Sequence, residues 1–363
     1  MNQLCPVNSH NEWDPLEEVI VGRLEFAMFP DWDMINLFTM PPGEWESYAA
    51  HVAGKAGNPY KLEIVQAAQK ALNEFLHILE SEGITIRRPD LVQYYAQPFA
   101  TPTWQVNGGF CSANPRDVFL VIGNEIIETP MADRARYFES WAYRSLLTEY
   151  FKAGAHWTAA PKPQLTENLY DLNYQQKSKT DGKARYVVTE IEPTFDAADF
   201  VRCGRDIFGQ RSHVTNQLGI DWLQRHLGDD YRVHTIENQS PYAIHIDTTF
   251  MPLAPGKVLI SPDYVDVNHL PEVLKKWDIL VAPEPIPYQN KPFGLSDWIS
   301  INTLMLDEKR IIVEKRQKPL IKCLKEWGFS PIPCSFEGYY PFLGGFHCAT
   351  LDVRRRGDLQ SYF

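Results

Sequence analysis

The stretch Asp117-Val-Phe-Leu-Val-Ile-Gly-Asn-Glu-Ile-Ile-Glu128 decides the fold, because it predicts two short apolar strands joined by a tight Gly-Asn turn. The same arrangement recurs three times further along the chain, at residues 198–208, 249–261 and 302–314. Each repeat predicts a β-hairpin of similar length. One strand-rich unit is therefore used several times.

The two ends of the chain predict a fifth strand pair. Residues 16–22 and 348–353 are both apolar and each is long enough for one strand, so we expect them to pair with each other. Helical segments lie between the strand pairs, at residues 61–82, 214–227 and 319–328. The sequence thus predicts an α/β fold built from about five similar units.

The length of 363 residues alone favours two domains. Fivefold repetition of one unit favours a different arrangement, in which residues 1–363 form a single closed, propeller-like array. Strand edges of such an array meet near a common axis. Residues that are far apart in the sequence can therefore share one site.

Composition excludes several classes of protein. No apolar run approaches the roughly 18 to 20 residues of a membrane span, and the net charge of −11 disfavours a nucleic-acid partner. The first residues have neither the basic nor the apolar segment of a signal peptide. Six scattered cysteines favour reduced thiols in the cytoplasm. No phosphate loop, dinucleotide motif or zinc spacing is present, so we expect no cofactor.

Cys348 is the candidate nucleophile. It closes the motif Leu343-Gly-Gly-Phe-His-Cys348, and the basic run Arg354-Arg355-Arg356 begins six residues later. A thiolate is a strong nucleophile, and cationic neighbours lower the pKa of a thiol from its usual value of about 8.5. We therefore expect the basic run to activate Cys348. The alternative is a buried structural thiol, the role that we expect for the other five cysteines.

Acids and an imidazole stand at the edges of other predicted strand pairs. Asp117 precedes the first hairpin, Asp196 the second, and His245 with Asp247 the third. Similar units arranged about one axis would bring these side chains to Cys348. A metal site made of His245, Asp247 and Asp196 is an alternative. It leaves Cys348 without a role, so we expect no metal.

These motifs resemble the arginine amidinotransferases of the guanidine-modifying (pentein) superfamily. Only residues 29–60 and 166–184 fit the family poorly. Residues 110–117, 201–204 and 339–344 are most similar to the cyanobacterial branch that acts in saxitoxin biosynthesis. The matching blocks are residues 5–22, 115–117, 123–127, 160–163, 195–200, 204–208, 245–247, 306–310, 345–348 and 352–357.

The resemblance implies a five-bladed α/β propeller with pseudo-fivefold symmetry and an active site in its central channel. It implies that Cys348 attacks the guanidinium carbon of L-arginine, releases L-ornithine and carries the amidino group to a primary amine. Asp117 and Asp247 would grip the guanidinium. His245 would move protons, oriented by Asp196. We also expect a homodimer.

Two further residues are implied, and one rival is weighed. Ser296 matches a serine that contacts the amino-acid end of the substrate. His347 is the rival of His245 as the proton carrier, or His245 is only a core histidine. Because alternate residues of a strand face opposite ways, we expect His347 and Cys348 not to point into the same site.

Tyr264 is a departure from the family pattern. The glycine-using members have an arginine at this position, which suits a substrate carboxylate, and tyrosine offers no charged bidentate pair. The departure implies an acceptor other than glycine, such as a saxitoxin-type intermediate, whose site residues 29–60 would line. The alternatives are a glycine amidinotransferase, an arginine hydrolase that forms citrulline, and a non-catalytic propeller scaffold.

Overall fold

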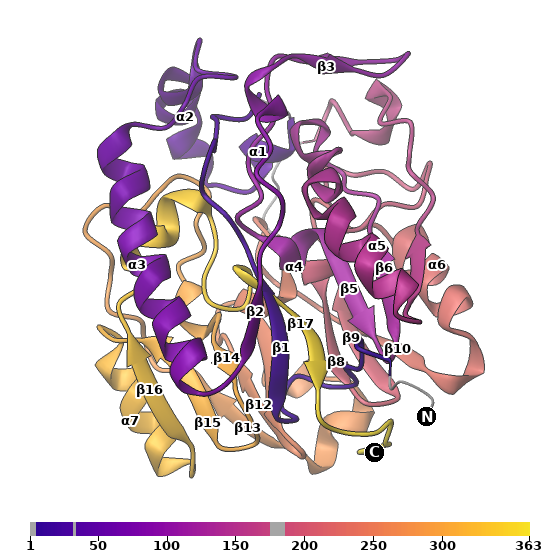
Figure 1. Cartoon of the computed structure of the whole chain (residues 1–363), viewed down its shortest axis with the longest axis vertical. Helices are drawn as coiled ribbons and strands as arrows, with labels where there is room; N and C mark the ends of the chain where they lie inside the picture. Colours follow the sequence, from indigo (N-terminus) through magenta and orange to yellow (C-terminus); the bar gives the residue numbers. More distant parts are fainter. Residues whose placement is uncertain (1–4, 32–33, 175–185) are drawn as a thin grey trace.

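The computed structural model describes residues 5–31, 34–174 and 186–363 and has an α/β fold with mixed sheets (Figure 1). In the described part, five sheets have three strands each: an antiparallel pair and a third strand parallel to the middle one. They are unit 1 (β17, Thr350–Arg355; β1, Leu16–Val21; β2, Thr85–Arg87), unit 2 (β5, Phe119–Ile122; β6, Glu125–Glu128; β7, His156–Ala159), unit 3 (β8, Phe200–Cys203; β9, Asp206–Gln210; β10, Arg232–Ile236), unit 4 (β11, Phe250–Ala254; β12, Lys257–Ile260; β13, Asp278–Val281) and unit 5 (β14, Leu304–Met305; β15, Arg310–Glu314; β16, Ser330–Cys334).

The antiparallel pairs confirm the predicted hairpins of units 2 to 5. Gly123, Gly204 and Gly256 turn the hairpins of units 2, 3 and 4 with φ of +60°, +69° and +75°, values that suit a residue without a side chain. The predicted pairing of the two chain ends is also confirmed, because β1 runs antiparallel to β17. Figure 1 shows this pair as an indigo and a yellow strand side by side.

Helices join the middle and outer strands of four units: α3 (Leu62–Ser81), α5 (Arg144–Lys152), α6 (Gln217–Leu227) and α7 (Lys318–Glu326). Three of them confirm the predicted helices, and α5 was not predicted. Each turns an apolar stripe inward, as α3 does with Leu72, Phe75 and Leu79. Unit 4 has two 3-10 turns instead, η9 (Val267–His269) and η10 (Glu272–Lys276). Pro271 directly precedes η10, a place that proline tolerates because the N–H there would have no helical partner.

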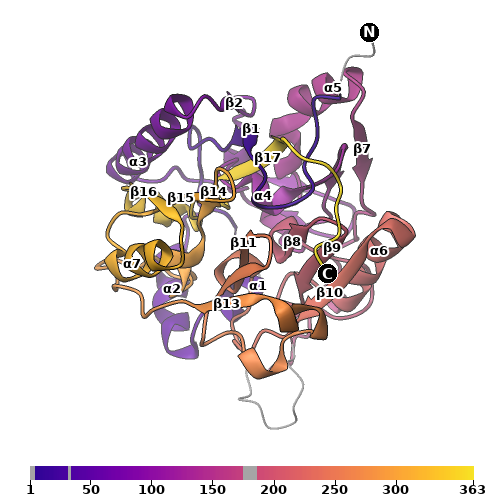
Figure 2. The ribbon, with the colours of Figure 1, turned by 90° about the horizontal axis from the view of Figure 1, so that it is seen from below.

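Apolar residues fill the spaces between neighbouring units. Figure 2 shows α3, α5, α6 and α7 at the periphery, with β17, β8 and β11 nearer the middle. Each junction has a buried cluster with residues of both units, such as Leu351 and Val121 (units 1 and 2), Ile127 and Phe200 (2 and 3), Val201 and Met251 (3 and 4), Leu259 and Ile311 (4 and 5), and Ile312 and Val19 (5 and 1).

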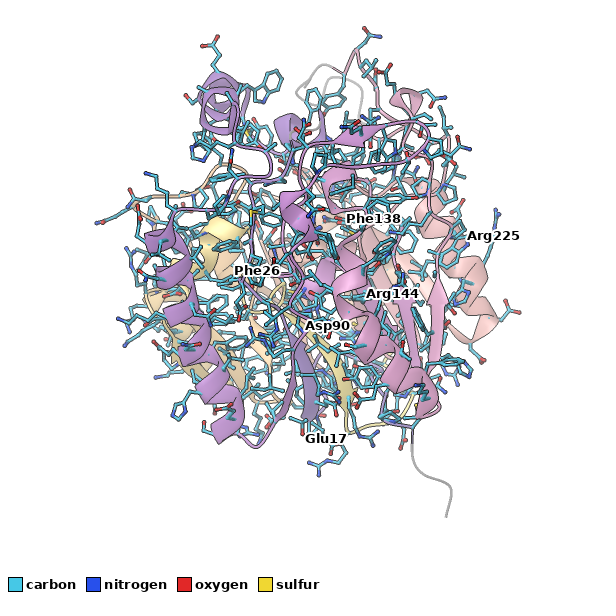
Figure 3. The ribbon with its side chains drawn as sticks, turned by 45° about the horizontal axis from the view of Figure 1, so that its top comes forward. Glu17, Phe26, Asp90, Phe138, Arg144 and Arg225 are labelled. Atoms are coloured by element: carbon cyan, nitrogen blue, oxygen red, sulfur yellow. The ribbon has the colours of Figure 1, made fainter. Side chains whose placement is uncertain are left out.

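Several further elements lie at the upper end of the molecule in Figure 1: α1 (Met34–Phe38), η1 (Pro42–Glu44), α2 (Trp45–Val52), and the strand pair β3 (Phe99–Ala100) and β4 (Gln105–Val106). Aromatic contacts hold this region down, for example Tyr60 on Phe342 at 4.8 Å between ring centroids. Side chains such as Arg225 project from the outer surface (Figure 3). Among the described residues, no helix combines the length and apolar character that crossing a bilayer requires.

Candidate active site

The inner strand of each unit is the strand of its antiparallel pair that lies at the edge of the sheet: β17, β5, β8, β11 or β14. Each unit places a polar residue just before this strand. Asp117 lies in α4 (Pro115–Val118) before β5, and Asp196 caps the 3-10 turn that precedes β8. Asp247 lies in η8 (Ile246–Thr248) before β11, and Cys348 lies in the turn before β17. Asn302 has the same place before β14. The structure brings all five to one buried site. Sequence reasoning missed Asn302, although it opens the predicted hairpin at 302–314.

Cys348 is held by two neighbours. Its Sγ lies 3.2 Å from Oδ2 of Asp247 and accepts a hydrogen bond from Nδ2 of Asn302 at 3.0 Å. The side chain is 3% exposed. Burial raises the pKa of the Cys348 thiol to about 12, and the charges of Asp247 and Asp117 act in the same direction, against the influence of His245. Ionisation of the Cys348 thiol is therefore disfavoured in these surroundings.

The expected activation of Cys348 by the basic run is wrong. Arg355 binds Asp352 at 2.6 Å, and Arg354 binds Glu17 at 2.9 Å, so their charges are already paired. The run belongs to β17, which leads away from the turn that holds the thiol. The arginines that are close to Cys348 in the sequence are therefore not its charged neighbours in the structure.

His245 lies between two carboxylates. Its Nε2 is 3.1 Å from Oδ2 of Asp196, and its Nδ1 is 3.6 Å from Oδ1 of Asp117. Burial alone would lower the pKa of His245, but the Asp117 charge and the hydrogen bond to Asp196 outweigh it and raise the pKa well above 6.5. The backbone φ of +57° is strained for histidine. Such strain is typical of a functional site.

Three acids leave one oxygen each without a donor. Oδ2 of Asp117 pairs with Arg136 at 2.9 Å, and Oδ2 of Asp247 pairs with Nδ1 of His347 at 2.9 Å. Oδ2 of Asp196 is the partner of His245. The Oδ1 atom of each acid is buried and has no hydrogen-bond partner among the described residues. Buried acceptors are normally satisfied, so these three oxygens indicate a ligand rich in N–H groups.

The expectation for His347 is wrong in its premise. His347 and Cys348 lie on a turn, in which Ala349 N–H bonds Gly345 O at 3.0 Å, and strand alternation does not apply there. His347 and Cys348 both contact Oδ2 of Asp247. The other ring nitrogen of His347 lies 3.3 Å from Glu12. His347 therefore connects Asp247, in the site, with the buried carboxylate of Glu12.

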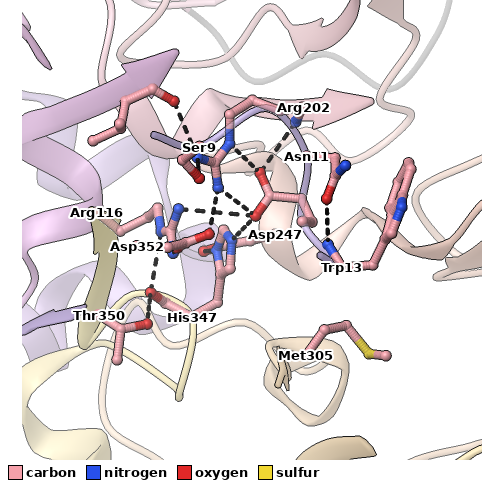
Figure 4. Close-up of polar contacts among 12 residues, drawn as sticks. Ser9, Asn11, Trp13, Arg116, Arg202, Asp247, Met305, His347, Thr350 and Asp352 are labelled. Carbon is pink, nitrogen blue, oxygen red and sulfur yellow. Dashed lines mark hydrogen bonds and ion pairs between the residues drawn. The ribbon is translucent and has the colours of Figure 1, made fainter. Parts of the chain in front are cut away.

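Those charges form a buried network that sequence reasoning did not find (Figure 4). Arg202 binds Glu12 at 2.8 Å and Asp352 at 2.6 Å, and Arg116 also binds Asp352. Burial raises the cost of each charge, and the ion pairs offset it. The network ties the N-terminal segment and units 1, 2 and 3 together below the site.

Ser296 and Tyr264 lie together, with 3.3 Å between the two hydroxyl oxygens. Neither forms a hydrogen bond with Cys348, His245 or the three acids in the described part of the chain. Ser296 also accepts from the backbone N–H of Trp298 at 3.1 Å. The structure thus pairs the two predicted specificity residues with each other, and Ser296 lies on the segment that leads to Asn302.

Asp117, His245 and Cys348 place an oxygen, a nitrogen and a sulfur within 4.8 Å of one another. Each is a type of metal ligand. A metal here would occupy the thiol and the imidazole that covalent chemistry requires. We therefore interpret the group as a nucleophile with its acid–base partners.

No protein-family model matches the chain. A solved amidinotransferase from Microseira wollei, described as part of the saxitoxin biosynthetic pathway, is 66% identical with a TM-score of 0.95, and the match covers 99% of this chain and all of that one. The L-arginine:L-lysine amidinotransferase of Pseudomonas savastanoi pv. phaseolicola is 46% identical over 99% of this chain and 97% of its own length. The mitochondrial glycine amidinotransferase of Xenopus tropicalis is 44% identical over 99% of this chain and 86% of its own length. Such identity along the whole chain means common descent, and this protein belongs to the amidinotransferases of the pentein superfamily.

Proposed function

We propose that the protein transfers the amidino group of L-arginine, through a covalent bond to Cys348, to a primary amine of a saxitoxin-type biosynthetic intermediate. The observation that supports L-arginine as the donor is the set of three buried carboxylate oxygens at the site that accept no hydrogen bond from the described residues. A guanidinium supplies planar N–H groups and a positive charge, which is what paired carboxylates bind best. Asp117 and Asp247 are the proposed grips.

The reaction proceeds in two transfers. The Cys348 sulfur bonds to the guanidinium carbon, the bond from that carbon to the ornithine nitrogen breaks, and His245 gives this nitrogen a proton. Ornithine leaves, and the amidino group stays on sulfur. The acceptor amine then gives a proton to His245 and attacks the same carbon, which breaks the carbon–sulfur bond. Asp196 keeps the imidazole in place.

Charge balance suggests when the thiol ionises. Asp117 and Asp247 disfavour a thiolate, and the positive charge of a bound guanidinium would offset theirs. The thiol therefore releases its proton to solvent as the donor binds, and the sulfur attacks as a thiolate while His245 stays protonated. Because its pKa is raised, His245 holds a proton that it can give to the departing ornithine nitrogen.

Alkylation of Cys348 by iodoacetamide in the free protein is expected to rise about tenfold per pH unit from pH 7 to 10, without a plateau. The thiolate fraction grows in this way at any pH below the pKa, which burial raises to about 12. Peptide mass mapping at each pH measures it, with Cys348→Ala as the blank. A plateau below pH 9 would mean that the free site already holds a thiolate.

The acceptor is proposed from Tyr264 and from the relatives. The names of the relatives give different acceptors, glycine in one and lysine in another, so acceptor use varies on a common scaffold. Tyr264 gives a substrate carboxylate no charged partner, and a buried unpaired carboxylate is costly. Residues 29–60 are proposed to line the acceptor site, and residues 32–33 lie outside the described part. Tyr48 of this segment packs on Phe293, three residues before Ser296.

Tyr264→Arg is expected to raise kcat/KM for glycine relative to larger amines without a carboxylate. The new guanidinium would pair with the glycine carboxylate, as a bidentate contact allows. The measurement is kcat/KM for glycine and for a panel of alkyl and amino-ketone amines with arginine saturating. Ser296→Ala is a matched control that disturbs the same hydroxyl pair without adding charge. If kcat/KM of the parent for glycine equals or exceeds that for the best other amine, the protein is instead a glycine amidinotransferase.

One experiment separates transfer from hydrolysis. Labelled arginine is incubated with the protein and each amine, and the products are separated. Amine-dependent ornithine supports transfer. Citrulline formed without an amine supports an arginine hydrolase, and neither product supports a non-catalytic scaffold.

We also propose that the five units close into one five-bladed propeller, a single catalytic domain with the site in its channel. The apolar junctions between units 1 and 2 through 5 and 1 support this closure. The free state of all six cysteines supports a reducing compartment such as the cytoplasm. The homodimer and the absence of a cofactor stay predictions.

A further inference from the structure

Asn302 makes three contacts with the turn that carries Cys348. Its Oδ1 accepts from the backbone N–H groups of His347 at 2.9 Å and of Cys348 at 3.2 Å. Its Nδ2 donates to Cys348 Sγ at 3.0 Å. The two backbone donors fix which end of the amide is the oxygen, so the NH₂ group must face the sulfur.

The turn is shaped around this side chain. Asn302 is 1% exposed, and its own carbonyl accepts from Phe346 N–H at 3.2 Å. A Cβ atom at Gly345 would lie 2.5 Å from Asn302 Oδ1, so only glycine leaves room for the amide there. Asn302 and Gly345, the second glycine of the nucleophile motif, therefore pack directly against each other.

We propose that Asn302 is a further catalytic residue, whose oxygen holds the nucleophile turn and whose N–H group stabilises the Cys348 thiolate. This rests on the proposed role of Cys348 as the nucleophile. An N–H bond to sulfur favours the charged form over the thiol. The groups of other units that face the sulfur are Asp117, His245 and Asp247, and His347 faces Asp247 from the same turn.

A neutral donor suits this site for a physical reason. A lysine or arginine beside the sulfur would also stabilise a thiolate, but its charge would repel the cationic guanidinium from Asp117 and Asp247. The Asn302 amide stabilises the thiolate without that repulsion. It is the one side-chain N–H that the described residues give the sulfur at hydrogen-bond distance, apart from the acid–base group His245.

The test measures Cys348 alkylation by iodoacetamide against pH in Asn302→Ala and Asn302→Asp. Loss of the donor predicts alkylation about 10- to 100-fold slower than in the parent at every pH from 7 to 10, the range for a hydrogen bond to a charged atom. Asn302→Asp keeps the acceptor for both backbone N–H groups and should be slower still, because it adds negative charge. Asn302→Asp also keeps the test valid if the alanine variant does not fold.

A merely structural role predicts the opposite sign. A loosened turn would expose a buried thiol and speed its alkylation, so equal or faster alkylation in either folded variant overturns the proposal. Asn114→Ala is the matched control, because Asn114 is also buried and holds the same loop through Phe342 O at 2.8 Å without bonding the sulfur. Alkylation needs no amidino donor. Its outcome is therefore independent of whether the ornithine assay supports the proposed function.

Discussion

Cys348→Ala is expected to abolish ornithine release from L-arginine, with kcat lower by about 10⁶-fold, as in other enzymes that lose a covalent nucleophile. The sulfur is the atom that would carry the amidino group, and alanine leaves nothing to carry it. The parent protein, mixed briefly with arginine and quenched in acid, should gain the mass of one amidino group on Cys348. Intact-mass analysis followed by peptide mapping measures this directly.

Cys323→Ser is the control for the loss of a thiol elsewhere. Cys323 is half-buried in α7, at the periphery of the molecule, and its replacement should leave turnover unchanged. An adduct on another cysteine, or undiminished turnover in Cys348→Ala, would falsify the covalent mechanism.

His245→Asn is expected to lower kcat by about 10²- to 10⁴-fold, the range for a lost acid–base group. Asparagine and histidine are both among the residues found most often at positive φ, so the replacement should not add backbone strain. Asp196→Asn should lose part of the same factor, because the imidazole keeps its place but loses the carboxylate that holds its charge. Single-turnover measurements of ornithine release give both values, and thermal melting checks the fold.

The matched control is His234→Asn. His234 also pairs with a buried carboxylate, Asp206 at 2.7 Å, but it lies on β10, the outer strand of unit 3. Its loss should leave kcat within a few-fold of the parent. A similar result for His245→Asn would instead move proton transfer to His347, which contacts the same Asp247 oxygen as Cys348.

The repeated hairpin made most of the fold predictable. Strand pairs such as β5 with β6 are local, so their apolar residues and their turn are visible in a dozen consecutive positions. The outer strands were harder, because β7 and β10 pair in parallel with residues far along the chain. The pairing of β1 with β17 was predictable only because one strand was left over at each end.

The candidate site was predictable where its residues occupy equivalent places in the repeat. Asp117, Asp196, Asp247 and Cys348 all precede an inner strand, and the same rule would have found Asn302. The environment of each group was not predictable. The thiol pKa depends on acids contributed by other units, and the arginines near Cys348 in sequence pair with Asp352 and Glu17 instead.

The pairing of β1 with β17 has a consequence for how the enzyme is made. The ribosome adds β17 roughly 330 residues after β1, which takes about 20 seconds to a minute at about 5–20 residues per second. During that time the nascent chain already contains Asp117, Asp196 and Asp247, which precede the inner strands of units 2 to 4. It does not yet contain Cys348 or β17, the antiparallel partner of β1. Cys348 thus arrives with the strand that finishes unit 1. On the proposed mechanism, unfinished chains in the cell can neither capture an amidino group nor release one to the wrong amine.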